Sequence, residues 1–214
     1  MTDVYHQLAG GGPASPDGRY HGVVIGIVTN NSDPDGLARV KVALPWLADD
    51  VETDWARVAA PMAGPGRGCY FLPEVGDEVL VAFEHGNPEV PYVVGALWNG
   101  KDAPPATNAD GNNDVRMMVS RSKHVIRLID TKQDERIEIV DGSGKNSIVI
   151  STKDNQITVT ADADVVISAG GRLRLAGAGV EITSTADVKV EAKSALAVKS
   201  SGQLDIKGSQ VNIN

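Results

Sequence analysis

The chain has 214 residues, a formal net charge of -8, a hydrophobic content of 42% and a charged content of 22%. These values are typical of globular proteins and exclude wholesale disorder, and no apolar run approaches the roughly 18 residues of a membrane helix. The single cysteine, Cys69, excludes an intrachain disulfide framework, and the acidic balance disfavours nucleic-acid binding. We expect one or two folded domains.

Composition divides the chain after residue 105. All nine aromatic residues lie at or before Trp98, and all eleven prolines lie at or before Pro105. Residues 147–214 hold seven basic and seven acidic side chains, so the whole net charge of -8 lies in the first 146 residues. A segment without aromatic residues must build its interior from small and β-branched side chains. This composition favours a thin, repetitive body over a second ordinary globule.

Residues 1–20 are predicted to be a flexible arm, because they are rich in glycine and proline and contain little to bury. The segment lacks a basic region followed by an apolar core, so it does not read as a secretory signal. We therefore expect the protein to be synthesised in the cytoplasm.

Residues 21–100 alternate strand-like apolar runs with turn signals such as Asp33-Pro34-Asp35-Gly36 and His85-Gly86-Asn87-Pro88. No helical pattern separates the runs, so five short strands in about 80 residues predict a small five-stranded barrel. Residues 101–118, which are rich in Gly, Pro, Asn and Asp, are expected to be a linker. The predicted strands cover residues 21–28, 38–44, 55–59, 78–84 and 91–97.

The strongest signal is a pair of aliphatic columns in the last third of the chain, called here the aliphatic columns. Successive members are separated by 8, 8, 7, 8, 8, 8 and 7 residues in both columns, and every member is Val, Ile or Leu. The first column is Ile157, Val165, Leu173, Val180, Val188, Leu196, Leu204 and Val211. The second column is Val159, Ile167, Leu175, Ile182, Val190, Val198, Ile206 and Ile213.

Positions i and i+2 of a strand face the same side, so each repeat predicts a short strand with two inward aliphatic residues. Ile148 and Ile150 precede the series, as do Ile137 and Ile139, whereas Arg127 and Asp130 interrupt the next candidate pair. The pattern is therefore expected to weaken before residue 137.

A lone sheet with this pattern would expose a continuous apolar face far larger than monomers tolerate. A single-chain β-helix needs about 20 or more residues per coil, which repeats of seven or eight residues do not provide. We therefore expect an obligate homotrimer in which each chain supplies one face of a prism and the columns meet on the axis. At about 4.8 Å per strand, nine strands give a shaft of roughly 40 Å.

Candidate catalytic and metal motifs are weak. Asn31-x-Asp33-x-Asp35-Gly36 begins like a calcium loop, but Val42 stands where the loop needs Glu, so a turn is the preferred interpretation. Cys69 and His85 could form a nucleophile and base, although a half-buried structural cysteine is preferred. The four histidines are too dispersed for a metal site. We expect no catalytic residue, no cofactor and no metal ligand, although sequence spacing leaves an ion on the trimer axis open.

Residues 21–214 closely resemble spike proteins of contractile injection machines, the gpV/VgrG-type baseplate family. Several long ordered blocks carry the resemblance, and the aliphatic columns follow them as they do in that family. The blocks include Ala38-Arg39-Val40-Lys41-Val42, Leu44-Pro45-Trp46-Leu47, Trp55-Ala56-Arg57-Val58-Ala59, Phe71-Leu72-Pro73-Glu74-Val75-Gly76-Asp77-Glu78-Val79 and Val94-Gly95-Ala96-Leu97-Trp98-Asn99-Gly100.

The resemblance implies an all-β protein with an OB-fold barrel at residues 21–100 and a trimeric, intertwined β-helix shaft at residues 119–214. It implies that the barrel docks on a hub and that the shaft punctures the target envelope, so the membrane is contacted only during puncture. Because about 20 residues precede the barrel, the hub is expected to be a separate protein. The final residues, still in phase with the repeat, suggest a separate PAAR-type tip protein.

Two functions remain open at this point. The leading hypothesis is a mechanical, non-catalytic spike, placed in the baseplate of a phage tail, a secretion system or an extracellular contractile particle. The alternative is an oligomeric OB-fold module that binds an oligosaccharide or nucleic acid and carries a β-helical stalk. A binding face for single strands needs exposed aromatic residues in a basic groove, which the acidic first part of the chain opposes.

Overall fold

The structure is a computed structural model, and it describes residues 18–48 and 51–212. Most of the predicted arm (residues 1–17) and Ile213 lie outside the described residues. Apart from one 3-10 turn, the regular secondary structure of the described residues is strand, as the all-β expectation requires. In chain order the elements are β1 (Val23–Asn30), β2 (Lys41–Ala43), β3 (Arg57–Val58), β4 (Ala63–Gly64), β5 (Arg67–Gly68), β6 (Glu78–Phe83), η1 (Glu84–Gly86), β7 (Pro91–Ala96), β8 (Val115–Val119), β9 (Val125–Ile129), β10 (Arg136–Val140), β11 (Ser147–Ser151) and β12 (Gln156–Thr160).

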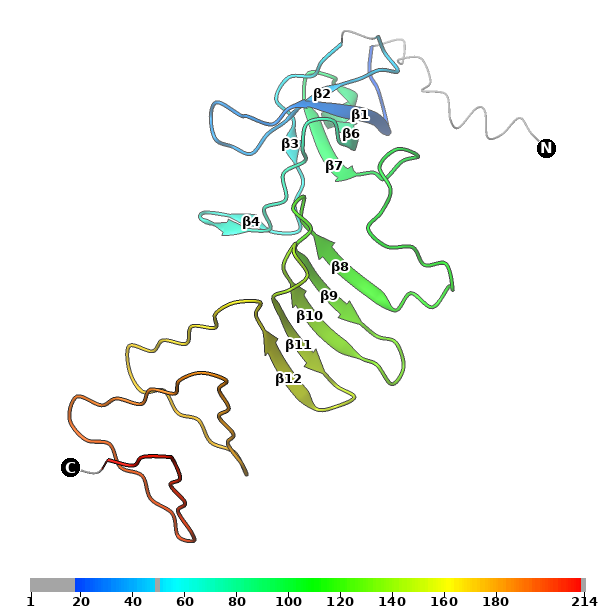
Figure 1. The fold of residues 1–214 in the computed structure, drawn as a ribbon. Coiled ribbons are helices and arrows are strands. Elements are labelled where there is room, and N and C mark those ends of the chain that lie inside the picture. The colour runs from blue at the N-terminus through cyan, green and yellow to red at the C-terminus, as the bar shows by residue number, and fades with distance from the viewer. Residues whose placement is uncertain (1–17, 49–50, 213–214) are drawn as a thin grey trace. The chain divides into compact units, whose positions relative to one another are not determined.

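The first sheet has the order β2-β1-β6-β7-β3, with β3 parallel to β7 and the other pairs antiparallel (Figure 1). Isolated bridges join Val40 to Ala56 and Ala43 to Glu52, so the segments around the two edge strands are also connected. The sheet therefore curls into a small barrel. Each of its five strands overlaps one of the five predicted runs, although β1 ends at Asn30, two residues beyond its run. The short hairpin β4–β5 adds a pair that the sequence pattern did not predict.

The barrel core is built from valine more than from aromatic residues. Val40, Val42, Val79 and Val81 are fully buried, because alternate residues of β2 and β6 face inward. Tyr20, Trp46 and Phe83 close one part of this core, with the Tyr20 and Trp46 rings edge to face at 5.2 Å. This small, β-branched core satisfies the alternation that the apolar runs predicted.

The second sheet is an antiparallel meander with the order β12-β11-β10-β9-β8 (Figure 1). Its first strand, β8, begins at Val115, inside the range expected to be linker. Each of its four connections contains one residue with a left-handed backbone: Lys123, Gln133, Gly144 and Asn155. A tight reversal of the chain commonly needs such a residue, so these four positions mark where the chain folds back on itself.

The chain divides into two compact units, the first ending at Thr160 and the second beginning at Ala161. Residues 161–212 contain no strand and no hydrogen-bonded turn, and every residue from 162 to 212 is exposed. No residue in this stretch has a left-handed backbone. Strand pairing within the chain therefore ends at Thr160 among the described residues.

Candidate functional site

One face of the β8–β12 sheet is covered by aliphatic side chains and is called here the column face. In the β10–β11 ladder Ile137 is opposite Ile150 and Ile139 is opposite Ile148. In the β11–β12 ladder Ile148 is opposite Val159, and Ile150 is opposite Ile157. Ile157 and Val159 are the first members of the aliphatic columns, so the columns run on without a break across this sheet.

The column face extends further upstream than the sequence pattern indicated. Ile126 is opposite Ile139 and Leu128 is opposite Ile137, while Met118 is opposite Ile126. The expectation that the pattern weakens before residue 137 is therefore corrected. Arg127 lies between the two aliphatic residues and points to the other face, so it does not interrupt the pair. The i and i+2 spacing of Ile126 and Leu128 was the signal that could have found them, although the apolar Val125 and Ile129, on the other face, partly conceal it.

The aliphatic residues of the column face are half-exposed in the single chain. Their side chains are between 41% and 50% exposed, and those of Ile157 and Val159 are 69% and 58% exposed. A contiguous exposed patch of this kind marks an interaction surface in soluble proteins. The members upstream of β12 are Met118, Ile126, Leu128, Ile137, Ile139, Ile148 and Ile150.

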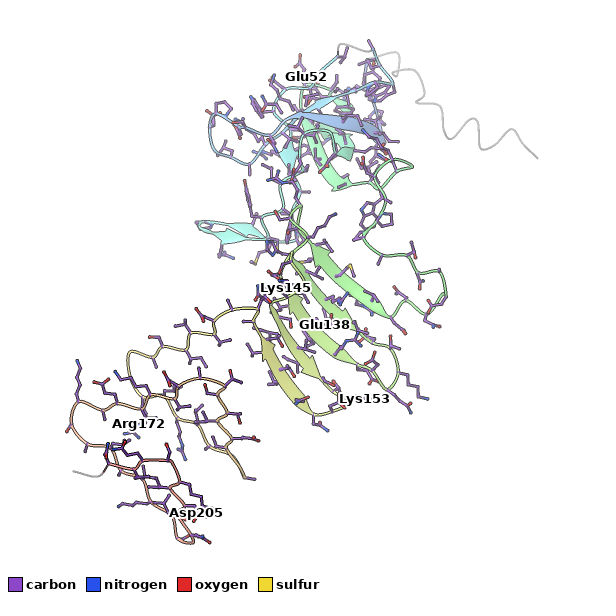
Figure 2. The ribbon with its side chains drawn as sticks, in the orientation of Figure 1. Glu52, Glu138, Lys145, Lys153, Arg172 and Asp205 are labelled. Atoms are coloured by element: carbon purple, nitrogen blue, oxygen red, sulfur yellow. The ribbon has the colours of Figure 1, made fainter. Side chains whose placement is uncertain are left out.

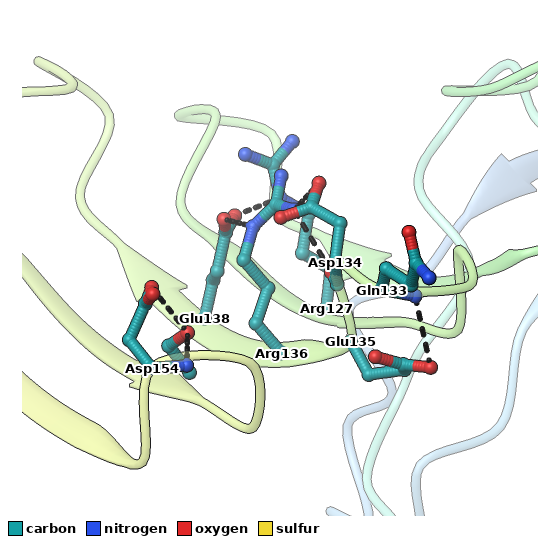
Figure 3. A network of polar contacts seen from close by, with 8 residues as sticks. Arg127, Gln133, Asp134, Glu135, Arg136, Glu138 and Asp154 are labelled. Atoms are coloured by element: carbon teal, nitrogen blue, oxygen red, sulfur yellow. Dashed lines mark hydrogen bonds and ion pairs between the residues drawn. The ribbon is translucent and has the colours of Figure 1, made fainter.

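The opposite face of the same sheet carries an ion-pair network centred on Glu138 (Figure 3). Glu138 is only 6% exposed and accepts hydrogen bonds from Arg127 Nε and from Arg136 Nε, the latter at 2.5 Å. Arg136 also pairs with Asp134. Burial raises the pKa of Glu138, but the hydrogen bonds from Arg136 and Arg127 outweigh it and hold the pKa below its ordinary value. This face therefore combines buried charges with apolar residues such as Val125 and Ile129, of which Ile129 is 8% exposed.

Residues 161–212 keep the alternation of a strand without a strand partner. Position pairs two residues apart are joined by polar contacts, as between Lys189 Nζ and Glu191 at 2.6 Å and between Gln203 and Asp205 at 2.8 Å. These side chains lie on one side of a locally extended backbone, opposite the column positions. The column members from Val165 to Val211 are all between 48% and 72% exposed.

The barrel carries a second polar cluster, at the loop that resembles the start of a calcium site. The Asp33 carboxylate accepts hydrogen bonds from Arg39 Nε at 2.8 Å and from the Leu37 backbone N–H at 3.0 Å, and its side chain is 3% exposed. The Arg39 hydrogen bond, opposed by burial, holds the pKa of Asp33 far below its usual range. Asp35 also pairs with Arg39, at 2.6 Å. The segment forms the turn preferred from the sequence, since the Gly36 backbone N–H donates to the Asp33 carbonyl oxygen at 3.1 Å.

Next to this loop, two cations lie near the ring of Trp55. Arg39 Cζ and Lys41 Nζ are 5.8 and 5.7 Å from the centre of its ring. Glu52, labelled in Figure 2, accepts hydrogen bonds from Lys41 at 2.9 Å and from the Thr29 hydroxyl at 2.6 Å. These bonds hold the pKa of Glu52 below its usual range, the Thr29 bond being the stronger influence. Asp33 and Asp35 thus bind Arg39, and Glu52 binds Lys41.

A groove of about 720 Å³ runs along the segment from Val58 to Leu72, next to the β4–β5 hairpin. Tyr70 and Phe71 are 74% and 71% exposed there, and Arg67 is its one charged lining residue. Cys69 lines the groove and is half-buried, whereas His85 lies in η1, outside the lining. The groove is not basic, so it lacks the charge that a single-stranded nucleic acid requires.

Within residues 18–48 and 51–212, no three His, Cys, Asp or Glu side chains lie close enough together to hold a metal ion. The same residues include no helix with the length and apolar character needed to cross a membrane.

Comparison with known proteins places the barrel in a family. Residues 24–98 match the type VI secretion system/phage-baseplate injector OB domain. The chain is 32% identical over 93 residues to the type VI secretion system spike protein VgrG3 of Vibrio cholerae, a match that covers 42% of the chain and 9% of the relative. It is 29% identical over 139 residues to the spike protein VgrG1a of Pseudomonas aeruginosa, which covers 59% of the chain and 22% of the relative.

A third relative, the actin cross-linking toxin VgrG1 of Vibrio cholerae, is 28% identical over 141 residues. That match covers 63% of the chain and 12% of the toxin, whose name describes the whole protein. The chain therefore spans no more than about a fifth of the length of these curated relatives. The predicted resemblance is confirmed: residues 24–98 match the injector OB domain, and the chain is similar to VgrG spike proteins, as expected for a gpV/VgrG-type baseplate spike.

Proposed function

We propose that the protein is the trimeric, non-catalytic central spike of a contractile injection machine. In this proposal the OB barrel docks on the hub of the baseplate, and residues 119–214 form an intertwined β-helix shaft that punctures the target envelope. A separate hub protein and a PAAR-type tip protein are the proposed partners, and neither a cofactor nor a metal is required. The injector OB domain and the similarity to spike proteins support the role in the baseplate.

The observation that carries the trimer is the loss of strand pairing after Thr160 while the aliphatic pattern continues. Up to Thr160 each strand finds its neighbour within the chain. From Ala161 to Asn212 the columns persist, but the described residues provide no strand neighbour and no left-handed turn to create one. Extended backbone with unpaired polar groups and exposed aliphatic residues is not stable in isolation. Strands from other copies of the chain supply hydrogen-bond partners for the backbone and apolar neighbours for the aliphatic side chains.

Three copies fit the pattern better than two. Each repeat presents two inward side chains, and a prism of three faces lets three such pairs meet on one axis. The sixteen proposed core residues are those of the aliphatic columns, and all of them are the β-branched or leucine side chains that fill a narrow interior. Polar residues such as Lys189 and Asp205 then lie on the outer surface.

Sedimentation equilibrium tests the trimer directly. A particle of three times the chain mass of 22.5 kDa is expected, and a stable monomer would refute both the shaft and the spike. The injection role is tested separately, by co-purification of the trimer with sheath and tube proteins of the machine. A trimer that never associates with these proteins would support the shaft and contradict the proposed role.

A further inference from the structure

We propose that residues 115–160 fold within each chain as a register-setting template, and that residues 161–212 become ordered from this template toward the C-terminus as three copies join. This inference rests on the proposed trimer and adds the surface on which assembly begins. That surface is the column face of the β8–β12 sheet, and its occupants are two further copies of this chain.

The aliphatic columns cannot define the register between chains by themselves. Every member is Val, Ile or Leu, and the spacing is nearly uniform at seven or eight residues. A chain displaced by a full repeat would set Leu173 where Val165 belongs and still bury an aliphatic side chain. Strands whose pattern repeats in this way have weakly specified register. Something outside residues 161–212 must select one alignment.

The β8–β12 sheet has the irregularity that the columns lack. The column-face pairs advance by eleven residues from Ile126 to Ile137, by eleven from Ile137 to Ile148 and by nine from Ile148 to Ile157. No displacement by seven or eight residues superimposes these steps. The Arg127–Glu138 pair adds a charged contact that only one pairing of β9 with β10 satisfies. The sheet therefore has a unique register before other copies arrive.

The same sheet is already ordered in a single chain. Its four ladders pair five residues each, so its backbone hydrogen bonds do not depend on other copies. Residues 161–212 have no such pairing among themselves and must be ordered during association, which costs conformational entropy. The cost per residue is lowest next to strands that are already fixed, and β12 is the edge strand that adjoins Ala161. Order is therefore expected to propagate from β12.

Continuity along the chain identifies the occupant of the column face. Ile157 and Val159 belong both to β12, opposite Ile150 and Ile148, and to the first repeat of the aliphatic columns. If the columns meet on a threefold axis, the residues paired with them in the same sheet face that axis as well. The template face is thus buried by the corresponding faces of two other copies.

The full-length wild type is first examined by sedimentation equilibrium, since a monomer here would refute the proposed trimer rather than the template. Two substitutions are then compared, Ile150→Asp on the column face and Ile206→Asp near the distal end. We expect Ile150→Asp to abolish the trimer. Ile206→Asp should remain trimeric, with faster amide hydrogen exchange confined to the residues around and beyond Leu204. Thr158→Asp is the control, because Thr158 lies in β12 on the face opposite Ile157 and Val159.

Hydrogen exchange also shows whether the template survives. In the Ile150→Asp monomer the amides of β9 and β10 should stay protected, while residues 161–200 exchange about 100-fold faster than in the trimer. If β9 and β10 lose protection in Ile150→Asp, the double variant Ile148→Thr/Ile150→Thr is used in place of Ile150→Asp. Threonine retains the strand propensity of a β-branched residue. The template is refuted if Ile206→Asp abolishes the trimer as completely as the column-face variant, or if a column-face variant forms a trimer with residues 161–200 protected.

Discussion

Arg127 on β9 and Glu138 on β10 occupy paired positions of the ladder, on the face of the sheet opposite Ile126 and Ile139. A slip of two residues would keep every aliphatic side chain on its own face but would separate this pair. The ion pair therefore distinguishes the observed register of β9 and β10 from one displaced by two residues.

Glu138→Gln is expected to destabilise the β8–β12 sheet. The substitution leaves Arg127 and Arg136 without their shared carboxylate at a site where Glu138 is 6% exposed. The loss should be about 2 kcal/mol of unfolding free energy, since breaking a buried charged hydrogen bond leaves its partners unsatisfied. Urea denaturation followed by circular dichroism measures it. Glu135→Gln on the same hairpin is the control, and an equal loss in both variants would contradict the assignment.

The same carboxylate gives a pH dependence with a defined sign. The pKa of folded Glu138 lies below its ordinary value of 4.5, so its stabilising contribution is fully present above pH 4.5. It is lost as the pH falls from 4.5 through the lower pKa of the folded state. The difference in unfolding free energy between wild type and Glu138→Gln should therefore shrink in acid. A difference that grows below pH 4.5 would mean that folding raises the pKa of Glu138, which contradicts this account.

Asp33→Asn is expected to loosen the loop between β1 and β2. Asp33 accepts two hydrogen bonds from the Arg39 guanidinium and three from backbone N–H groups, all of which prefer a charged acceptor. Thermal unfolding should show a lower midpoint for Asp33→Asn than for Asp35→Asn, whose carboxylate binds Arg39 from a largely exposed position. Equal midpoints for the two variants would mean that the loop does not depend on Asp33.

Gly26→Ala is expected to destabilise the barrel. A Cβ at Gly26 would overlap Val42 Cγ1 and lie 3.0 Å from the Ala43 carbonyl oxygen, because β1 and β2 approach closely there. Overpacking of this kind costs about 2 kcal/mol of unfolding free energy. Gly95→Ala is the matched control in β7, since its Cβ would meet no atom within 4 Å. Urea unfolding that ranks the two variants equally would count against this account of the core.

Deletion of one complete repeat tests the periodic shaft. Removal of residues 165–172 keeps the aliphatic columns in phase, so the trimer should form with a shaft shorter by about 4.8 Å, one strand spacing. Removal of residues 165–168 places the later repeats half a period out of phase and should leave them unprotected in hydrogen exchange. Sedimentation and exchange measurements on both variants decide the point. If both deletions gave the same sedimentation behaviour and the same exchange protection, a repeat-based shaft would be excluded.

The sequence by itself indicated the barrel, because its apolar runs are short, contain no helical pattern and end at glycine, proline and aspartate turns. The five apolar runs coincide with β1, β2, β3, β6 and β7. It also determined the aliphatic columns, since a spacing of seven or eight residues is visible without any structure. The sequence also predicted the turn at Asp33 and Asp35, because the loop lacks the glutamate that a calcium site needs.

Only the tertiary structure decided where the columns begin. Ile126 and Leu128 flank an arginine, which interrupts the sequence pattern, and only the ladder of β9 with β10 places them on the column face. The tertiary structure also decided that strand pairing within the chain ends at Thr160. Side-chain alternation is identical on both sides of that residue, because alternation follows from extended backbone alone. The neighbour of each strand depends on the length of the connection and on left-handed turn residues. Among the described residues, the last left-handed residue is Asn155.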